Sequence, residues 1–136
     1  KLIDLHDCFV ANKDFSEYKN KKLTIKDLEN LPLLVLTKGT ATRIRLDNFC
    51  EENNIHIKPA MEFSSNTLIK EFTEEGFGIG LLNEEHIKEE LQSGKLFKLN
   101  INLTLKEKYL GMVYNKENKS LVAKNFIKYI KDSIKN

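Results

Sequence analysis

The 136-residue sequence has no tryptophan, two prolines and two cysteines, and it lacks long apolar runs. The longest run, LPLLVL, is far too short to cross a bilayer, so we predict no membrane span. Cys8 and Cys50 match no metal-binding or redox spacing. We expect them to be buried thiols in a reducing compartment, which in the absence of a visible secretory leader indicates a cytoplasmic protein. We predict no metal and no cofactor.

A strong excess of either charge is also missing. Lysine and arginine total 22 residues against 20 acidic ones, and the two signs alternate along the chain. A nucleic-acid-binding segment normally presents a basic face, so this balance argues against that function here. The chain opens with Lys1 in an extended-looking run, and we therefore expect it to be a piece of a longer protein.

Short apolar runs alternate with amphipathic segments of about ten residues, which is typical of βαβ units. The fold class that this order predicts is α/β, with a mostly parallel central sheet and flanking helices. The predicted strands are 7–12, 32–36, 58–63, 78–82, 96–101 and 108–114. The predicted helices are a short turn at 24–30, then 40–54, 66–76, 84–94 and a last helix from about Ser120, with a loop at 13–22.

Local signals support these limits. Thr24 and Asp27 have the spacing of a capping box, and Asn83 can cap the helix that follows it. Gly76 and Gly94 fall where helices end. The apolar faces that we expect to be buried comprise Leu46, Phe49 and Cys50; Leu68, Ile69 and Phe72; Ile87 and Leu91; and Ala123, Phe126, Ile127, Ile130 and Ile134.

Three glycines, Gly76, Gly78 and Gly80, lie within five positions. A dinucleotide fingerprint needs a strand before the glycines and a helix after them, and here that order is reversed. No Gly-Lys-Ser or Gly-Lys-Thr follows. We therefore favour a turn between helix and strand, in which Gly76 ends the helix and the other two allow close backbone packing, over a phosphate site.

Motifs for catalysis are missing as well. The sequence has no G-x-S-x-G and no H-E-x-x-H, and each of its three histidines fits a surface or half-buried position. We predict that the chain is not an enzyme. A small α/β enzyme with an unrecognised acid or nucleophile remains an alternative, because several glutamate pairs lie along the helices.

Two loops each lead from the end of a strand into a helix. The first, called the threonine loop, comprises Thr37, Lys38, Gly39 and Thr40, and the second, called the serine loop, comprises Ser64, Ser65 and Asn66 after Phe63. In open α/β sheets, ligands bind outside the carboxyl ends of strands, where helix starts favour anions. Helix capping alone would also explain these residues. Two equivalent loops favour a shared site for a small anion.

At these loops the sequence resembles the effector-binding domain of LysR-type transcriptional regulators. Four stretches carry the resemblance: LTIKDLENLPLLVL, RIRLDNFCEENNIHIKPAMEF, TLIKEFTEEGFGIGLLNEEHIKEELQSGKLFKL and YLGMVYNKENKSLVAKNFIKYI. Each motif is loose, and their succession over nearly all 136 residues makes the match specific. Asn83 departs from the pattern, because the family usually has proline there.

The resemblance implies part of an effector-binding domain of the periplasmic-binding-protein-like, type II architecture. Residues 13–103 would form the second subdomain, and 1–12 with 104–136 would be hinge strands and part of the first. The effector would lie between the subdomains, against a wall made of both loops, Phe63 and Gly78. The implied parent is a homodimer or higher oligomer that binds DNA only through an absent N-terminal helix-turn-helix. The alternative with the same architecture is a solute-binding component of a transport system.

Overall fold

The structure is a computed structural model that describes residues 1–117 and 120–134. The chain divides into two compact units. The large unit is His6–Lys106, and the small unit combines Lys1–Leu5 with Glu107–Asn136. The large unit therefore begins earlier than the predicted subdomain limit of residue 13, because the strand that starts at Asp7 belongs to its sheet. Four residues of the predicted range 104–136, namely 118–119 and 135–136, lie outside the described residues.

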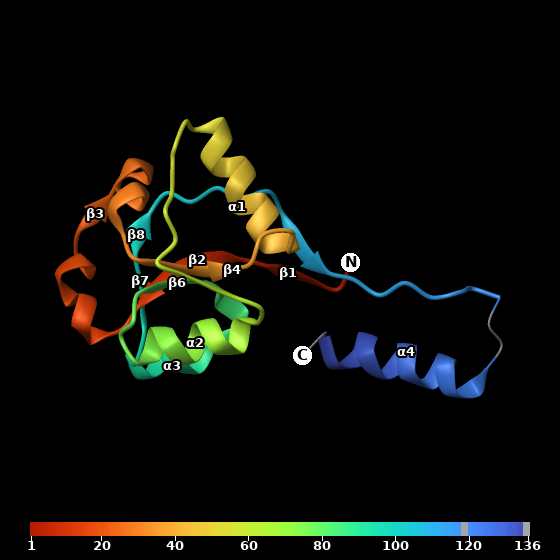
Figure 1. Ribbon diagram of the computed structural model, residues 1–136. Coiled ribbons are helices and arrows are strands. Elements are labelled where there is room, and N and C mark those ends of the chain that lie inside the picture. The colour runs from red at the N-terminus through yellow and green to blue at the C-terminus, as the bar shows by residue number, and fades with distance from the viewer. Residues whose placement is uncertain (118–119, 135–136) are drawn as a thin grey trace. The chain divides into compact units, whose positions relative to one another are not determined.

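A five-stranded sheet forms the centre of the large unit (Figure 1). Its order is β5 (Met61–Phe63), β4 (Leu33–Leu36), β6 (Ile79–Asn83), β2 (Asp7–Ala11) and β7 (Phe97–Lys98). β4 pairs in parallel with both β5 and β6, whereas β2 is antiparallel to β6 and β7. Four strands thus run in one direction and β2 runs against them, which confirms the α/β class with a mostly parallel sheet.

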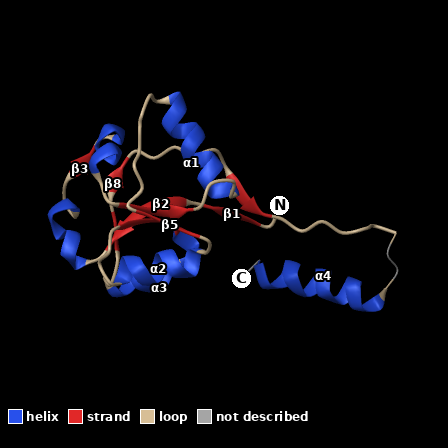
Figure 2. Cartoon of the chain, in the orientation of Figure 1, coloured by secondary structure: helices blue, strands red, loops and turns tan. Residues whose placement is uncertain are grey.

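Helices cover both faces of this sheet, and Figure 2 shows the layers. α1 (Ala41–Glu52) lies on one face, where its buried side chains Leu46 and Phe49 join an apolar cluster. α2 (Asn66–Glu74) and α3 (Lys88–Ser93) lie on the other, in a cluster that includes Ile69. Adjacent apolar residues of β2, β4 and β6 enter different clusters, because successive side chains of a strand point to opposite faces. The three-layer arrangement follows from that alternation.

Several predicted local features are confirmed. The backbone N–H of Thr24 donates to Asp27 Oδ2 at 2.7 Å, which forms the capping box of a 3-10 helix at Ile25–Asn30. Gly76, at φ +81°, follows the last turn of α2, and Gly94, at φ +77°, ends α3. Left-handed backbone of this kind is easiest for glycine.

Other local predictions are wrong in detail. The predicted loop at 13–22 contains a 3-10 helix, Lys13–Tyr18, whose first turn is capped by the Asn12 side chain. The predicted helix 84–94 is split into a 3-10 turn, Glu84–His86, and α3. Asn83 does not cap it, since its side chain makes no capping hydrogen bond and its amide nitrogen is buried without a partner. On α2, Ile69 is fully buried but Leu68 is 39% exposed.

The predicted strand 96–101 is divided between β7 and β8 (Asn100–Ile101). Between them, the N–H of Leu99 donates to the carbonyl of Phe9 at 2.9 Å, which continues the pairing of β7 with β2 by one residue. β8 then pairs in parallel with the short β3 (Lys22–Leu23) in a separate two-stranded sheet.

Within its described residues, the small unit contains two paired strands and one helix. β1 (Ile3–Leu5) pairs antiparallel with β9 (Lys108–Leu110), and α4 spans Leu121–Ile134. The predicted strand 108–114 therefore ends at Leu110. The apolar stripe predicted on α4 is not buried, and Phe126 is 58% exposed. Across the described residues, none of the helices combines the length and apolarity that a bilayer span requires.

Candidate functional site

The threonine and serine loops lie side by side at one edge of the sheet. Leu36, the last residue of β4, is the register partner of Phe63, the last residue of β5. One step further, the N–H of Thr37 donates to the carbonyl of Phe63 at 2.9 Å. Because β4 and β5 are parallel, both chains leave the sheet at the same edge, and each continues into a helix.

Both helices begin at this edge with a hydroxyl cap. The Thr40 hydroxyl accepts from the N–H of Arg43 at 3.4 Å and donates to the carbonyl of Thr37 at 3.0 Å. The Ser65 hydroxyl accepts from the N–H of Leu68 at 3.3 Å. The hydroxyls of Thr40 and Ser65 are thus engaged in helix capping, which was the alternative explanation for these residues. The positive ends of the α1 and α2 dipoles consequently lie at the same edge of the sheet.

Four other polar side chains of the two loops do not cap a helix. Within the described part of the chain, the hydroxyls of Thr37 and Ser64, the Lys38 ammonium and the Asn66 amide make no side-chain hydrogen bond or ion pair. Lys38, Ser64 and Asn66 are exposed, and Thr37 is half-buried. Gly39, at φ +89°, turns the threonine loop, and no neighbouring atom lies within 4 Å of the place where a Cβ would stand. These groups are therefore available to a ligand.

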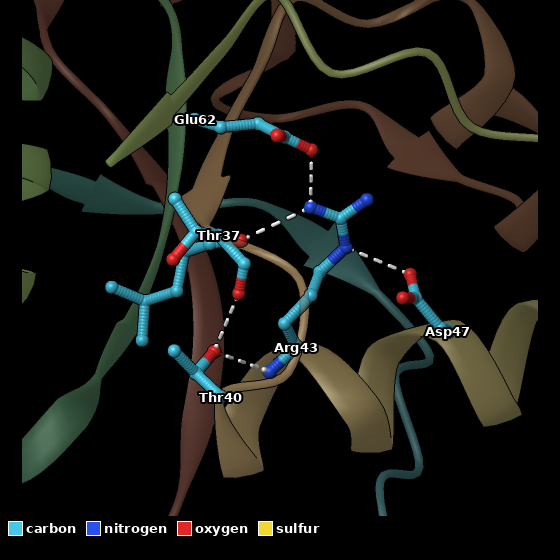
Figure 3. A network of polar contacts seen from close by, with 6 residues as sticks. Thr37, Thr40, Arg43, Asp47 and Glu62 are labelled. Carbon is cyan, nitrogen blue, oxygen red and sulfur yellow. Dashed lines mark hydrogen bonds and ion pairs between the residues drawn. The ribbon is translucent and has the colours of Figure 1, made fainter. Parts of the chain in front are cut away.

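Arg43 fixes the base of the threonine loop (Figure 3). Its side chain is 4% exposed, and its Nη1 donates to the carbonyl of Leu36 at 3.0 Å and to Glu62 Oε1 at 2.5 Å. Its Nε donates to Asp47 Oδ1 at 2.8 Å. One guanidinium thus connects the end of β4, the edge strand β5 and the second turn of α1. Its pairing with two carboxylates offsets the loss of hydration that burial causes.

Sequence reasoning did not assign a role to Arg43. Its position three residues after the cap of α1, next to a buried strand end, was the available signal. Together with Lys38 it lines an open hollow of about 400 Å³ beside α1, whose apolar lining comprises Cys50, Ile55 and Ile57. Asp47, Glu51, Asn54 and His56 complete the lining.

Gly78 lies elsewhere. It immediately precedes β6, whose Ile79 is the register partner of Leu33, the first residue of β4. Gly78 is therefore at the amino end of β4, whereas both loops follow carboxyl ends. A Cβ on Gly78 would stand 2.5 Å from the carbonyl oxygen of Pro32, so this glycine permits a close backbone approach. The structure does not bring Gly78 together with the other predicted site residues, and the site proposed below omits it.

The fold is that of the α/β, type II periplasmic-binding-protein-like class. The family model described as "LysR substrate binding domain" matches residues 1–135. The chain therefore belongs to the LysR substrate-binding domain family, as the sequence resemblance predicted.

Named relatives are consistent with this assignment. The chain is 30% identical over 122 residues to the HTH-type transcriptional activator CmpR of Synechocystis, and 30% identical over 122 residues to the RuBisCO operon transcriptional regulator of Acidithiobacillus ferrooxidans. In both comparisons the match covers 89% of this chain and 40% of the relative, so the chain spans less than half the length of these proteins. The relatives are regulators, which gives no support to the transport alternative.

Solved structures show the same fold. The CcmR regulatory domain of Synechocystis PCC6803, in complex with 2-PG, has a TM-score of 0.75 at 20% identity and covers 99% of this chain and 65% of that one. The effector-binding domain of QuiR, in complex with shikimate, has a TM-score of 0.70 at 16% identity, with coverage of 98% and 63%.

Proposed function

We propose that this chain senses a small-molecule effector for a LysR-type transcriptional regulator, and that the threonine and serine loops bind part of that effector. The observation that carries the proposal is the hydrogen bond from Thr37 to Phe63, which joins two strand-to-helix loops into one continuous polar edge. Family membership supports sensing as the task, and the geometry supports this edge as the place.

An anion suits this edge best. Two helix starts direct positive dipole ends toward it, and Lys38 adds an unpaired positive charge. The Thr37 and Ser64 hydroxyls and the Asn66 amide can donate hydrogen bonds, and Phe63 supplies an apolar surface beside them. The chemistry that this set recognises is a small metabolite with a carboxylate or phosphate group and a short carbon body.

The regulator would work by a shift of population. An effector that contacts these loops more favourably in one arrangement of the protein raises the share of that arrangement. In the parent protein the change would reach DNA through an N-terminal helix-turn-helix and through contacts between subunits. Operators with two-fold symmetry match homodimers, and a homodimer or a higher oligomer is accordingly the assembly that we propose.

Calorimetry on the full-length protein tests the site. The probes are 2-PG, shikimate and inorganic phosphate, and the variants are Thr37→Val and Ser64→Ala, which remove hydroxyls that do not cap a helix. For whichever probe the parent binds, each variant should weaken affinity by about tenfold, the loss expected for one hydrogen bond to a charged group. Ser93→Ala is the matched control, because its hydroxyl bonds only within the end of α3.

Unchanged affinity in both variants for a probe that the parent binds would contradict the site. Failure of all anionic probes, together with binding of a neutral metabolite that depends on Thr37, would keep the site and reject the anion. Weakening by Ser93→Ala to the same degree would indicate a general effect on stability.

A further inference from the structure

The chain passes between the two compact units twice, from Leu5 to His6 and from Lys106 to Glu107. One side chain of α1 contacts both of these crossings on the large-unit side. The guanidinium of Arg45 pairs through Nη2 with the carboxylate of Asp7, the first residue of β2. Its Nη1 donates to the carbonyl of Lys106 at 3.0 Å.

Burial makes the loss of either partner of this contact costly. The Asp7 side chain is 1% exposed and the Arg45 side chain is 14% exposed. A buried carboxylate needs a partner, because an unpaired charge in the interior is strongly destabilising. Arg45 also lies 3.5 Å from the hydroxyl of Thr42 on its own helix, which orients the guanidinium. A planar group with five donors can bond a carboxylate and a carbonyl at once, whereas a lysine ammonium cannot hold the same geometry.

Arg43 and Arg45 divide two tasks on one helix. Residues two apart on a helix point about 200° from each other. Arg43 accordingly reaches the carbonyl of Leu36 at the base of the threonine loop, and Arg45 reaches the crossings. α1 therefore connects the start of the candidate effector edge to both points at which the chain leaves the large unit.

The two crossings are not held equally. His6 has a second anchor: its N–H donates to Glu85 Oε2 at 3.0 Å, and its carbonyl accepts from the N–H of Glu84 at 2.7 Å. The second crossing runs through residues 102–107, which form no helix or strand. There Leu103 and Leu105 pack partly against the core, and Arg45 binds the carbonyl of Lys106.

We propose that Arg45 is a hinge clamp, a positioning residue that holds the large-unit side of both crossings to α1. Its regulatory meaning rests on the proposed function, since the threonine loop begins the same helix. A displacement of α1 on effector binding would then move both crossings together.

Hydrogen exchange on the full-length protein without ligand tests the clamp, so its outcome does not depend on any probe binding. In Arg45→Lys, the Leu103 amide, whose N–H donates to the carbonyl of Ile101 at 2.9 Å, should exchange about tenfold faster than in the parent, because the segment that contains it has lost a hydrogen bond to a charged group. Peptides spanning 5–8 should change less, because His6 keeps its second anchor. Peptides from β4 and β6 should not change. The matched control is Arg43→Lys, which should affect 37–40 and leave both crossings as they are.

A second variant covers the case in which Arg45→Lys misfolds. Arg45→Met combined with Asp7→Asn removes both charges, leaves no unpaired buried carboxylate and should give the same local increase. Unchanged exchange at both crossings in a folded variant overturns the clamp. An increase of the same size in β4 and β6 also overturns it, because that result describes general destabilisation and not the release of a hinge.

Discussion

The four hydroxyl groups of the two loops have two distinct uses. Thr40 and Ser65 cap helices, and their hydroxyls are already engaged with backbone groups. Thr37 and Ser64 precede them by one to three residues, and their hydroxyls make no hydrogen bond within the described residues. Residue type alone could not separate these uses, since both kinds of residue are small and lie after a strand. Only the placement of the first helical N–H groups shows which hydroxyls are committed to folding.

The two thiols should be unreactive in the folded protein. Burial raises the pKa of Cys8 to about 12 and that of Cys50 to about 11. The reactive species is the thiolate, so at pH 8 alkylation by iodoacetamide should be slower than in urea by on the order of a hundredfold at Cys50 and a thousandfold at Cys8. Mass spectrometry after timed alkylation would measure this. Equal rates with and without urea at either cysteine would contradict the burial described here.

Among single residues, sequence reasoning succeeded where one local rule decides. Thr24 with Asp27 and the left-handed positions of Gly76 and Gly94 are of this kind. It missed Arg43 and Arg45, because each has a partner far away along the chain: Glu62 is 19 residues from Arg43, and the Lys106 carbonyl is 61 residues from Arg45. Gly78 was placed with the wrong edge of the sheet for the same reason, since a strand's neighbours decide which end of it meets which loop.

At the scale of elements, the cap of α2 can be tested separately from binding. Ser65→Ala removes the acceptor for the N–H of Leu68 and should lower the free energy of unfolding by about 1 kcal/mol. Ser65→Asn, which retains a capping oxygen, should restore most of that loss. Urea denaturation of the three proteins would measure the differences. If Ser65→Asn were as unstable as Ser65→Ala, the hydroxyl would have a role other than capping.

Element order was predictable from periodicity, and element limits were less so. For the strongly apolar strands β4 and β6, the predicted first and last residues lie within one residue of the observed ones. The predicted strand 96–101 is divided because Phe97, Lys98 and Leu99 bond β2, whereas Asn100 and Ile101 pair with β3. Such a switch between two sheets depends on tertiary pairing, which apolar alternation does not record.

On the scale of the whole molecule, α4 should promote self-association of this 136-residue chain. Phe126 and Tyr129 are 58% and 68% exposed and lie next to Val122 on the helix surface. Exposed apolar surface of this extent favours burial against a partner. Light scattering should show a mass that rises with concentration, and Phe126→Lys with Tyr129→Lys should reduce it. Lys124→Glu with Lys128→Glu is the control for changed charge.

A mass that stayed monomeric at all concentrations would contradict this expectation. If Lys124→Glu with Lys128→Glu reduced association equally, the contact would depend on charge and not on the apolar side chains. In the full-length protein, other segments can cover the apolar side chains of α4. Comparing the solution mass of the full-length protein with that of the 136-residue chain would show whether both associate.

The pairing of β1 with β9 has a consequence for the order of folding. Leu5 and Lys108 are register partners, so this ladder closes a loop of roughly 100 residues. A closure of that length is entropically unfavourable while the intervening chain is unstructured. Once the sheet around β2 has formed, His6 and Lys106 are already bound within one body, and the remaining closure is short. The pairing of β1 with β9 should therefore form last. The slowest phase of refolding should be the one in which strand β1 becomes structured.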